Sequence, residues 1–241
     1  PAIMAVSLCA AEALRINGIT ATAAAGHSLG EYAAMVYTGM VSRTDGFKLI
    51  KARSLAMQKA AENSSGAMFA IIGSTPADIE KVCAETEGYV VPVNYNSSVQ
   101  TVIAGEEAAA QAAADTLAAA GARAIRLNVA AAFHSKLMQG AADEFKPAAE
   151  QISFKTPEIT MLSNISGTVL DSIDNMPERL ALHIVSPVKF TSELAYLSEN
   201  GYDTFIECGP GKVLTGLVKK TLKGVNAMNV QDADTLAKVI G

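Results

Sequence analysis

Apolar residues recur along this sequence in two spacings that alternate from beginning to end. In some segments they return every three or four positions, as on one face of a helix, and in others they form the short runs typical of strands. Clusters of glycine, serine and proline separate the segments. Helices are predicted over residues 1–17, 30–40, 44–63, 75–86, 106–120, 136–151, 177–184, 188–201, 212–223 and 233–240. Strands are predicted over residues 20–26, 67–73, 89–96, 100–105, 122–129, 158–164, 203–208 and 225–230.

The order of these elements predicts an α/β fold. Strands separated by helices favour a parallel sheet. Between residues 67 and 129 the order is βαββαβ, which is typical of a small ferredoxin-like module. We therefore expect a discontinuous α/β domain, formed by residues 1–63 and 131–241, that carries a small inserted subdomain over residues 64–130.

Composition narrows the class of protein. The 241 residues are enough for a sizeable core, half of them are hydrophobic, and no apolar run approaches the ~18 residues of a membrane helix. The net charge of −5, without a basic run, argues against nucleic-acid binding. Three scattered cysteines are too few for a disulfide framework or a metal site. We expect a reduced, cytoplasmic setting without a membrane partner.

The amino-terminal end lacks the basic region and cleavage site of a signal peptide. It opens with Pro1 inside a predicted helix that stops at Gly18, without a helix cap or a starting Met. We therefore expect further residues before Pro1 in the native protein.

The clearest candidate for chemistry is Ser28, in the pattern Gly26-x-Ser28-x-Gly30 between a predicted strand and a predicted helix. This context is that of a nucleophile elbow, in which a sharp turn exposes the serine hydroxyl at a helix N-terminus. The backbone N–H of Leu29 would then point at a developing oxyanion. The same context also suits an ordinary N-cap serine. The stretch by itself leaves both readings open.

A serine nucleophile needs a base, and the sequence offers three histidines. His134 lies between a predicted strand and a predicted helix, a junction where α/β folds place catalytic groups. Its alternative is a surface or capping histidine. His27 adjoins Ser28, so its ring is expected to point elsewhere. His183, late in a helix, is expected to interact with the helix dipole.

Arg53 has apolar neighbours on its helix face, Leu49 and Met57, four residues away on either side. A guanidinium in that setting either extends outward to water or is buried with an acidic partner. A third possibility is a planar fork that binds a carboxylate through two hydrogen bonds.

With these residues identified, the sequence resembles the malonyl-CoA:acyl carrier protein transacylases, the acyltransferase family of fatty acid and polyketide synthesis. The resemblance covers essentially the whole chain, in the ordered blocks Pro1-Ala2, GHSLGEYAA, VNYNSSVQTVIAG, AAFHSKLM, SNISG, SPVKF and ECGPGKVLTGLVKK. It implies an α/β-hydrolase-like core with a parallel sheet and an inserted ferredoxin-like subdomain.

The resemblance also implies a reaction. Ser28 would be the acylated nucleophile and His134 its base, in a ping-pong transfer of malonyl from malonyl-CoA to the phosphopantetheine thiol of acyl carrier protein. This scheme involves no cofactor and no metal.

Further residues match the family's binding positions. Arg53 would pair with the malonyl carboxylate, while Leu29 and Phe133 match the malonyl-selective pattern. His183 stands where the family usually has Gln, at a position whose main-chain carbonyl orients the catalytic histidine. Two other departures are Ala132, in place of a usual Pro, and the absence of an amino-terminal Gly-Gln-Gly block that supplies one oxyanion donor.

Two other functions remain open from the sequence. A serine thioesterase or hydrolase would need a triad acid, which no residue signals, and would leave Arg53 without a role. An inactive fragment that binds an acyl carrier is the second possibility. Four late lysines would suit an acidic carrier or CoA phosphates, or form a solvated helix face. They are Lys212, Lys219, Lys220 and Lys223.

Overall fold

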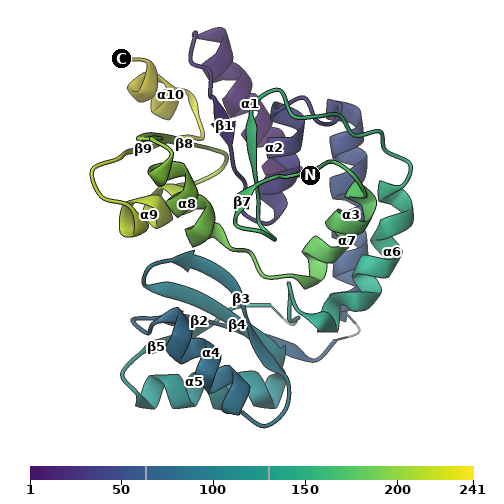
Figure 1. Cartoon of the computed structure of the whole chain (residues 1–241), viewed down its shortest axis with the longest axis vertical. Helices are drawn as coiled ribbons and strands as arrows, with labels where there is room; N and C mark the ends of the chain where they lie inside the picture. Colours follow the sequence, from purple (N-terminus) through teal and green to yellow (C-terminus); the bar gives the residue numbers. More distant parts are fainter. Residues whose placement is uncertain (63, 130) are drawn as a thin grey trace. The chain divides into compact units, whose positions relative to one another are not determined.

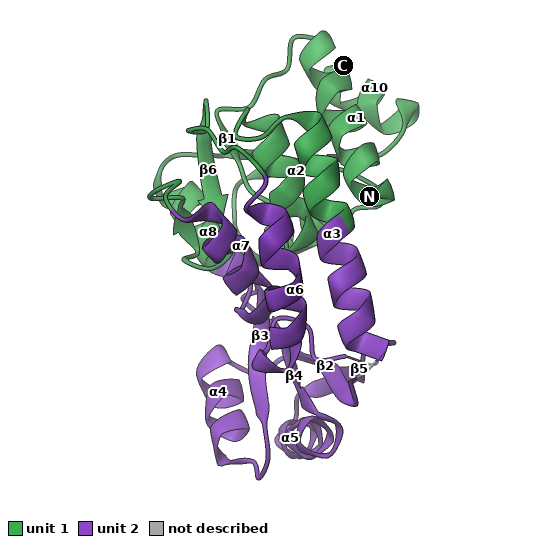
Figure 2. Cartoon of the chain, turned by 90° about the vertical axis from the view of Figure 1, so that its right-hand side faces the viewer, with its two compact units in different colours: residues 1–51, 152–174, 192–241 green, residues 52–151, 175–191 purple. Residues whose placement is uncertain are grey.

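The chain folds into two compact units, in a computed structural model that describes residues 1–62, 64–129 and 131–241 (Figures 1 and 2). Unit 1 comprises Pro1–Lys51, Ile152–Asp174 and Ser192–Gly241, and unit 2 comprises Ala52–Gln151 and Asn175–Thr191. Both units mix helices with short sheets, so the predicted α/β class is confirmed. The predicted domain boundaries fall on residues 63 and 130, which lie outside the described residues.

Unit 1 holds two small sets of paired strands with helices around them. Its elements are α1 (Ala2–Ile16), β1 (Ala23–Ala24), α2 (Leu29–Tyr37), the start of α3 (Arg43–Glu62), β6 (Thr160–Ser163), β7 (Thr168–Val169), most of α8 (Phe190–Glu199), β8 (Thr204–Cys208), α9 (Val213–Thr221), β9 (Asn226–Val230) and α10 (Ala233–Ile240). The pairs β1–β6 and β8–β9 are parallel, as predicted. Because Ala24 lies opposite Met161, the carboxyl ends of β1 and β6 meet at one edge.

Strand β7 departs from the prediction. It pairs with β6 in the antiparallel direction, after a turn in which the Gly167 N–H donates to the Ser163 carbonyl at 2.8 Å. A two-residue strand is too short to leave a periodic pattern in the sequence, so neither its existence nor its direction was predicted.

The end of the chain is held by an apolar cluster within unit 1. Ala10 and Leu14 of α1 are buried with Val230 of β9, and Leu236 and Val239 of α10 pack against them. Helix α10 begins with a capping box in which Asp232 and Thr235 exchange hydrogen bonds.

Unit 2 is built on a four-stranded antiparallel sheet of order β3-β4-β2-β5. Its elements are the end of α3, β2 (Gly66–Ile72), α4 (Pro76–Glu85), β3 (Val90–Ser97), β4 (Gln100–Glu106), α5 (Glu107–Ala119), β5 (Arg123–Arg126), the 3-10 turn η1 (Lys136–Met138), α6 (Gln139–Ala149) and α7 (Met176–Val185). The βαββαβ order predicted between residues 67 and 129 is the order found.

The two faces of this sheet have different neighbours. Phe69 and Ile71 of β2 are buried with residues of α4 and α5 on one face. On the other face, Met68 and Ala70 are buried with Ala132, and Phe133 packs against them. The strand alternation therefore places helices on one side and the loop before His134 on the other.

Candidate active site

Ser28 lies on a strained turn between β1 and α2. Its backbone angles are φ 53° and ψ −105°, a region that non-glycine residues rarely occupy and that costs about 1–3 kcal/mol. The residue stands at the N-cap position of α2, yet its side chain makes no capping hydrogen bond. The structure thus does not support the N-cap reading of Ser28. It fits a serine held on a sharp strand-to-helix elbow.

Only glycine fits at position 26, because the backbone of residues 30 and 31 passes close to it. A Cβ built on Gly26 would lie 2.1 Å from the carbonyl carbon of Gly30 and 2.2 Å from the amide nitrogen of Glu31. Both are backbone atoms, which cannot rotate away. A Cβ on Gly30 would meet nothing within 4 Å. Of the two glycines in the motif, steric closeness therefore explains Gly26 alone.

Leu29 is the first residue of α2 and is half-buried. Its N–H belongs to the first turn, where backbone donors have no acceptor within the helix. The helix dipole adds partial positive charge at the same place. This is the environment that an oxyanion requires.

Asn164 joins the elbow to strand β6, which it directly follows. The Ser28 N–H donates to Oδ1 of Asn164 at 2.7 Å, and Nδ2 of Asn164 donates to the Gly26 carbonyl at 2.6 Å. Asn164 is fully buried. Sequence reasoning missed this residue, although the SNISG block and the predicted strand before it were both signals.

His134 is buried in unit 2 with its ring nitrogen held by two carbonyl groups. Its Nδ1 lies 3.1 Å from the carbonyl oxygen of His183 and 3.1 Å from that of Ser186. Since carbonyl oxygens only accept, Nδ1 carries the proton, and in the neutral ring Nε2 carries the lone pair. Only 4% of His134 is exposed, so the surface reading is wrong.

The loop around His134 is fixed locally. His134 has a positive φ of 62°, a conformation that is uncommon outside glycine. The next residue, Ser135, donates its hydroxyl to the Ala132 carbonyl at 2.6 Å and accepts from the Leu137 N–H at 3.2 Å. Ala132, at the position where the family usually has Pro, is fully buried. The loop is thus tied by hydrogen bonds and packing.

His183 is buried in α7, and its ring centroid lies 5.5 Å from that of His134. It lies in the last turn of that helix, where an interaction with the helix dipole was expected. Its main-chain carbonyl lies where the resemblance implies, at Nδ1 of His134.

Arg53 is 4% exposed on α3, in the part of that helix that belongs to unit 2. Its neighbour Leu49 is buried and Met57 is half-buried. The outward-extending reading of the arginine is therefore wrong. A buried guanidinium is costly unless its charge is compensated, which makes this position one of chemical interest.

The candidate residues divide between the two units. Ser28 and Leu29 belong to unit 1. The other four, Arg53, Phe133, His134 and His183, belong to unit 2. Within the described residues, no group of three or more His, Cys, Asp or Glu side chains could hold a metal ion, and no helix is long and apolar enough to cross a membrane.

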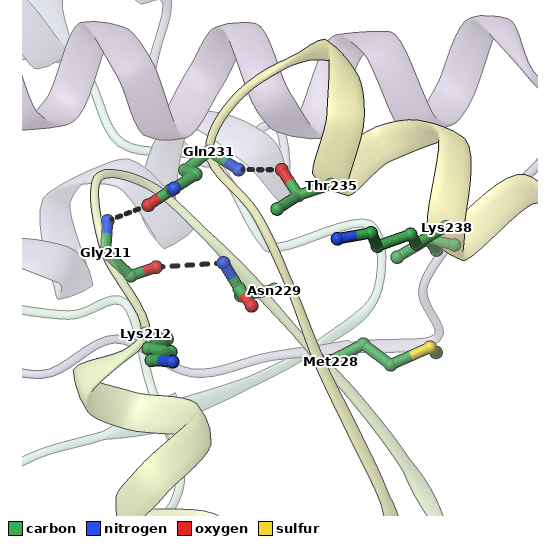
Figure 3. Close-up of a pocket in the computed structure, with 8 residues that line it drawn as sticks. Gly211, Lys212, Met228, Asn229, Gln231, Thr235 and Lys238 are labelled. Carbon is green, nitrogen blue, oxygen red and sulfur yellow. Dashed lines mark hydrogen bonds between the residues drawn. The ribbon is translucent and has the colours of Figure 1, made fainter.

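A separate open pocket of about 430 Å³ lies in unit 1, beside the loop that follows β8 (Figure 3). The Gly211 N–H donates to Gln231 at 2.8 Å, and Asn229 donates to the Gly211 carbonyl at 3.1 Å. Lys212 and Lys238 bring two ammonium groups to the lining. Lys212 thus places positive charge at the start of α9, whose last turn carries Lys219 and Lys220.

The chain matches one family model over nearly its full length. The family is described as the acyl transferase domain, and the match covers residues 1–240. Among curated relatives, the malonyl CoA-acyl carrier protein transacylase of Escherichia coli K12 is 36% identical over 244 residues, which is 100% of this chain and 79% of that protein. The enzyme of that name from Bacillus subtilis 168 is also 36% identical, over 100% of this chain and 77% of its own length.

Solved structures give the same result. A malonyl CoA-acyl carrier protein transacylase from Clostridium perfringens superposes with a TM-score of 0.96 at 36% identity, covering 100% of this chain and 77% of that one. A malonyl-transacylase solved in complex with its type II PKS acyl-carrier protein superposes with a TM-score of 0.92 at 35% identity, covering 98% of this chain and 78% of its own.

Proposed function

Because the chain belongs to the acyl transferase domain family, we propose that it transfers a malonyl group from malonyl-CoA to the phosphopantetheine thiol of acyl carrier protein, in fatty acid or polyketide synthesis. The observation that carries the proposal is the strained elbow at Ser28. Strain of about 1–3 kcal/mol at a half-buried serine that makes no capping hydrogen bond needs a functional reason, and nucleophilic attack supplies one.

The first half of the reaction forms an acyl-enzyme. The Ser28 hydroxyl attacks the thioester carbonyl of malonyl-CoA while Nε2 of His134 accepts its proton. The oxyanion that develops is stabilised by the Leu29 N–H at the start of α2. The tetrahedral intermediate then expels CoA, whose sulfur takes the proton from His134.

The second half returns the enzyme to its starting state. The carrier thiol gives its proton to His134 and attacks the malonyl ester on Ser28. When the ester bond breaks, Ser28 recovers the proton from His134 and malonyl-carrier is released. A thioester is consumed and a thioester is formed, so the reaction is close to balanced and needs no cofactor and no metal.

The role of His134 as base is supported by its hydrogen bonds. With Nδ1–H directed at the carbonyls of His183 and Ser186, the ring has one orientation and presents Nε2 as the proton acceptor. The two carbonyl dipoles also stabilise the imidazolium that forms when the proton is taken up. We assign the orienting role to the main-chain carbonyl of His183.

Selection of the substrate rests on three residues. The buried guanidinium of Arg53 would bind the malonyl carboxylate through a bidentate pair. Leu29 and the half-buried Phe133 would restrict the space beside the α-carbon. An α-methyl branch would cost about 1–3 kcal/mol there, so malonyl is favoured over methylmalonyl.

The finer features of the fold are part of the same proposal. We infer that residues 64–130 form a ferredoxin-like subdomain, and the sheet order β3-β4-β2-β5 with α4 and α5 on one face supports this. Residues 1–63 and 131–241 would then form an α/β-hydrolase-like core. A cytoplasmic location agrees with the substrates.

The test is to mix the full-length protein with malonyl-CoA and holo-acyl carrier protein and to follow both products by mass spectrometry. Malonyl-carrier should accumulate through a malonyl adduct on Ser28. Ser28→Ala should abolish both, whereas Ser198→Ala, the same change at an exposed position on α8, should abolish neither. Free malonate without malonyl-carrier would establish a hydrolase instead. Carrier binding without any adduct would establish an inactive binding protein.

A further inference from the structure

Asn164 is the centre of a buried polar network at the elbow. Its side-chain Oδ1 accepts from the Ser28 N–H at 2.7 Å, and its Nδ2 donates to the Gly26 carbonyl at 2.6 Å and to Glu193 Oε1 at 2.7 Å. Its own backbone N–H donates to Glu31 Oε2 at 2.9 Å. One residue thus contacts the turn on both sides of its sharpest point.

The arrangement leaves the Asn164 amide only one orientation. The group that faces Ser28 must be an acceptor, because it meets an N–H, and the group that faces Gly26 must be a donor, because it meets a carbonyl. A carboxylate at this position would place an acceptor against the Gly26 carbonyl. An isosteric Asn164→Asp change therefore keeps the packing and removes the hydrogen bonds that Nδ2 makes.

The two acidic residues of the network are also buried. Glu31, in the first turn of α2, is 2% exposed, and Glu193 of α8 is fully buried. Burial, and secondarily the charge of Glu31, raises the pKa of Glu193 well above its usual range. A raised pKa favours the neutral form of Glu193, whose Oε1 accepts the hydrogen bond from Nδ2 of Asn164.

The register of β1 and β6 explains how Asn164 reaches the elbow. Ala24 lies opposite Met161 in this parallel pair, so the residues that follow each strand leave the sheet at the same edge. Asn164 and Ser28 meet there although they are 136 positions apart in the chain.

We propose that Asn164 is a positioning residue that holds Ser28 and the adjacent Leu29 N–H in their reactive geometry, and that Glu193 supports it. This inference rests on the proposed acyl transfer. A backbone held at φ 53° and ψ −105° persists only where its surroundings fix it, and these hydrogen bonds fix it from both sides. Without them the turn relaxes, which displaces the nucleophile and its oxyanion donor together.

The experiment measures single-turnover acylation of Ser28 by malonyl-CoA, by intact mass, in the full-length protein. Asn164→Asp is expected to lower the acylation rate constant by about 100-fold at saturating malonyl-CoA, as for a lost oxyanion donor, while KM stays within about 3-fold. Leu14→Ala is the matched control, since it destabilises a buried cluster of unit 1 that includes no elbow residue. It should lower the thermal midpoint and leave acylation within about 2-fold.

A second pair of variants covers the case in which Asn164→Asp does not fold. Glu193→Gln keeps an oxygen acceptor for Nδ2 of Asn164 and should retain most of the acylation rate. Glu193→Leu removes that acceptor and should lower the rate by about 10-fold. Equal acylation rates in the two Glu193 variants, or an Asn164→Asp rate equal to that of the Leu14 control, would overturn the inference. Absence of any adduct on wild-type Ser28 would instead overturn the proposed function.

Discussion

Replacing Gly26 by alanine puts a methyl group inside the turn that carries Ser28. The new Cβ would lie 2.1 and 2.2 Å from the carbonyl carbon and oxygen of Gly30, and 2.2 Å from the amide nitrogen of Glu31. Ordinary van der Waals contact starts near 3.4 Å. The turn must therefore open by more than 1 Å, and no side chain can absorb the movement because all three neighbours are backbone atoms.

The cost has two parts. Overpacking of a rigid site costs about 1–3 kcal/mol. Opening the turn also breaks hydrogen bonds between the turn and Asn164, and each broken bond costs about 1 kcal/mol. The expected loss in the free energy of unfolding is about 3 kcal/mol or more. For a chain of this size that lowers the thermal midpoint by at least about 6 °C.

Gly30→Ala is the matched control. Its Cβ would meet nothing within 4 Å, and its position in the first turn of α2 favours alanine over glycine, by up to about 1 kcal/mol. Differential scanning calorimetry of both variants and the wild type measures the comparison. A Gly26→Ala midpoint within about 2 °C of wild type would refute the steric reasoning.

Three further predictions follow from buried or charged groups. Arg53→Ala should lower the rate of malonyl transfer by about 10- to 100-fold, while the rate of acetyl transfer stays the same or rises. Parallel assays with malonyl-CoA and acetyl-CoA measure the two rates. Equal losses in both would contradict binding of the malonyl carboxylate by Arg53. Burial raises the pKa of Glu193 in the folded chain above the value of ~4.3 that a glutamate has in the unfolded chain. The free energy of unfolding should therefore fall as the pH rises above ~4.3. Urea midpoints measured from pH 5 to 8 should show a flatter slope in Glu193→Gln than in wild type, and identical slopes would refute the assignment. Lys219→Glu with Lys220→Glu should raise KM for acyl carrier protein more than KM for malonyl-CoA, an effect that added salt should reduce; equal changes would speak against a carrier contact.

Much of the secondary structure and the elbow itself could be predicted from local sequence. Among the residues that the structure describes, apolar spacing located the helices and every strand except β7, because these patterns reflect the periods of the backbone. The glycine pair, with a strand before it and a helix after it, identified Ser28 as a candidate. His134 was identified in the same way, from its place at a junction. These features depend on neighbours within about one turn or one strand, and the sequence displays such neighbours directly.

The hydrogen bonds and the burial that hold the candidate residues in place were determined by the tertiary structure. Asn164 contacts Ser28 through the register of β1 and β6, and the carbonyls of His183 and Ser186 meet His134 across about 50 positions of chain. The burial of Arg53 likewise could not be read from its helix face, where the same apolar neighbours suit an extended or an enclosed guanidinium. Hydrogen bonds and burial between distant segments depend on which strands pair and in what register. A single sequence shows which groups can form hydrogen bonds, whereas the fold determines which of these groups come into contact.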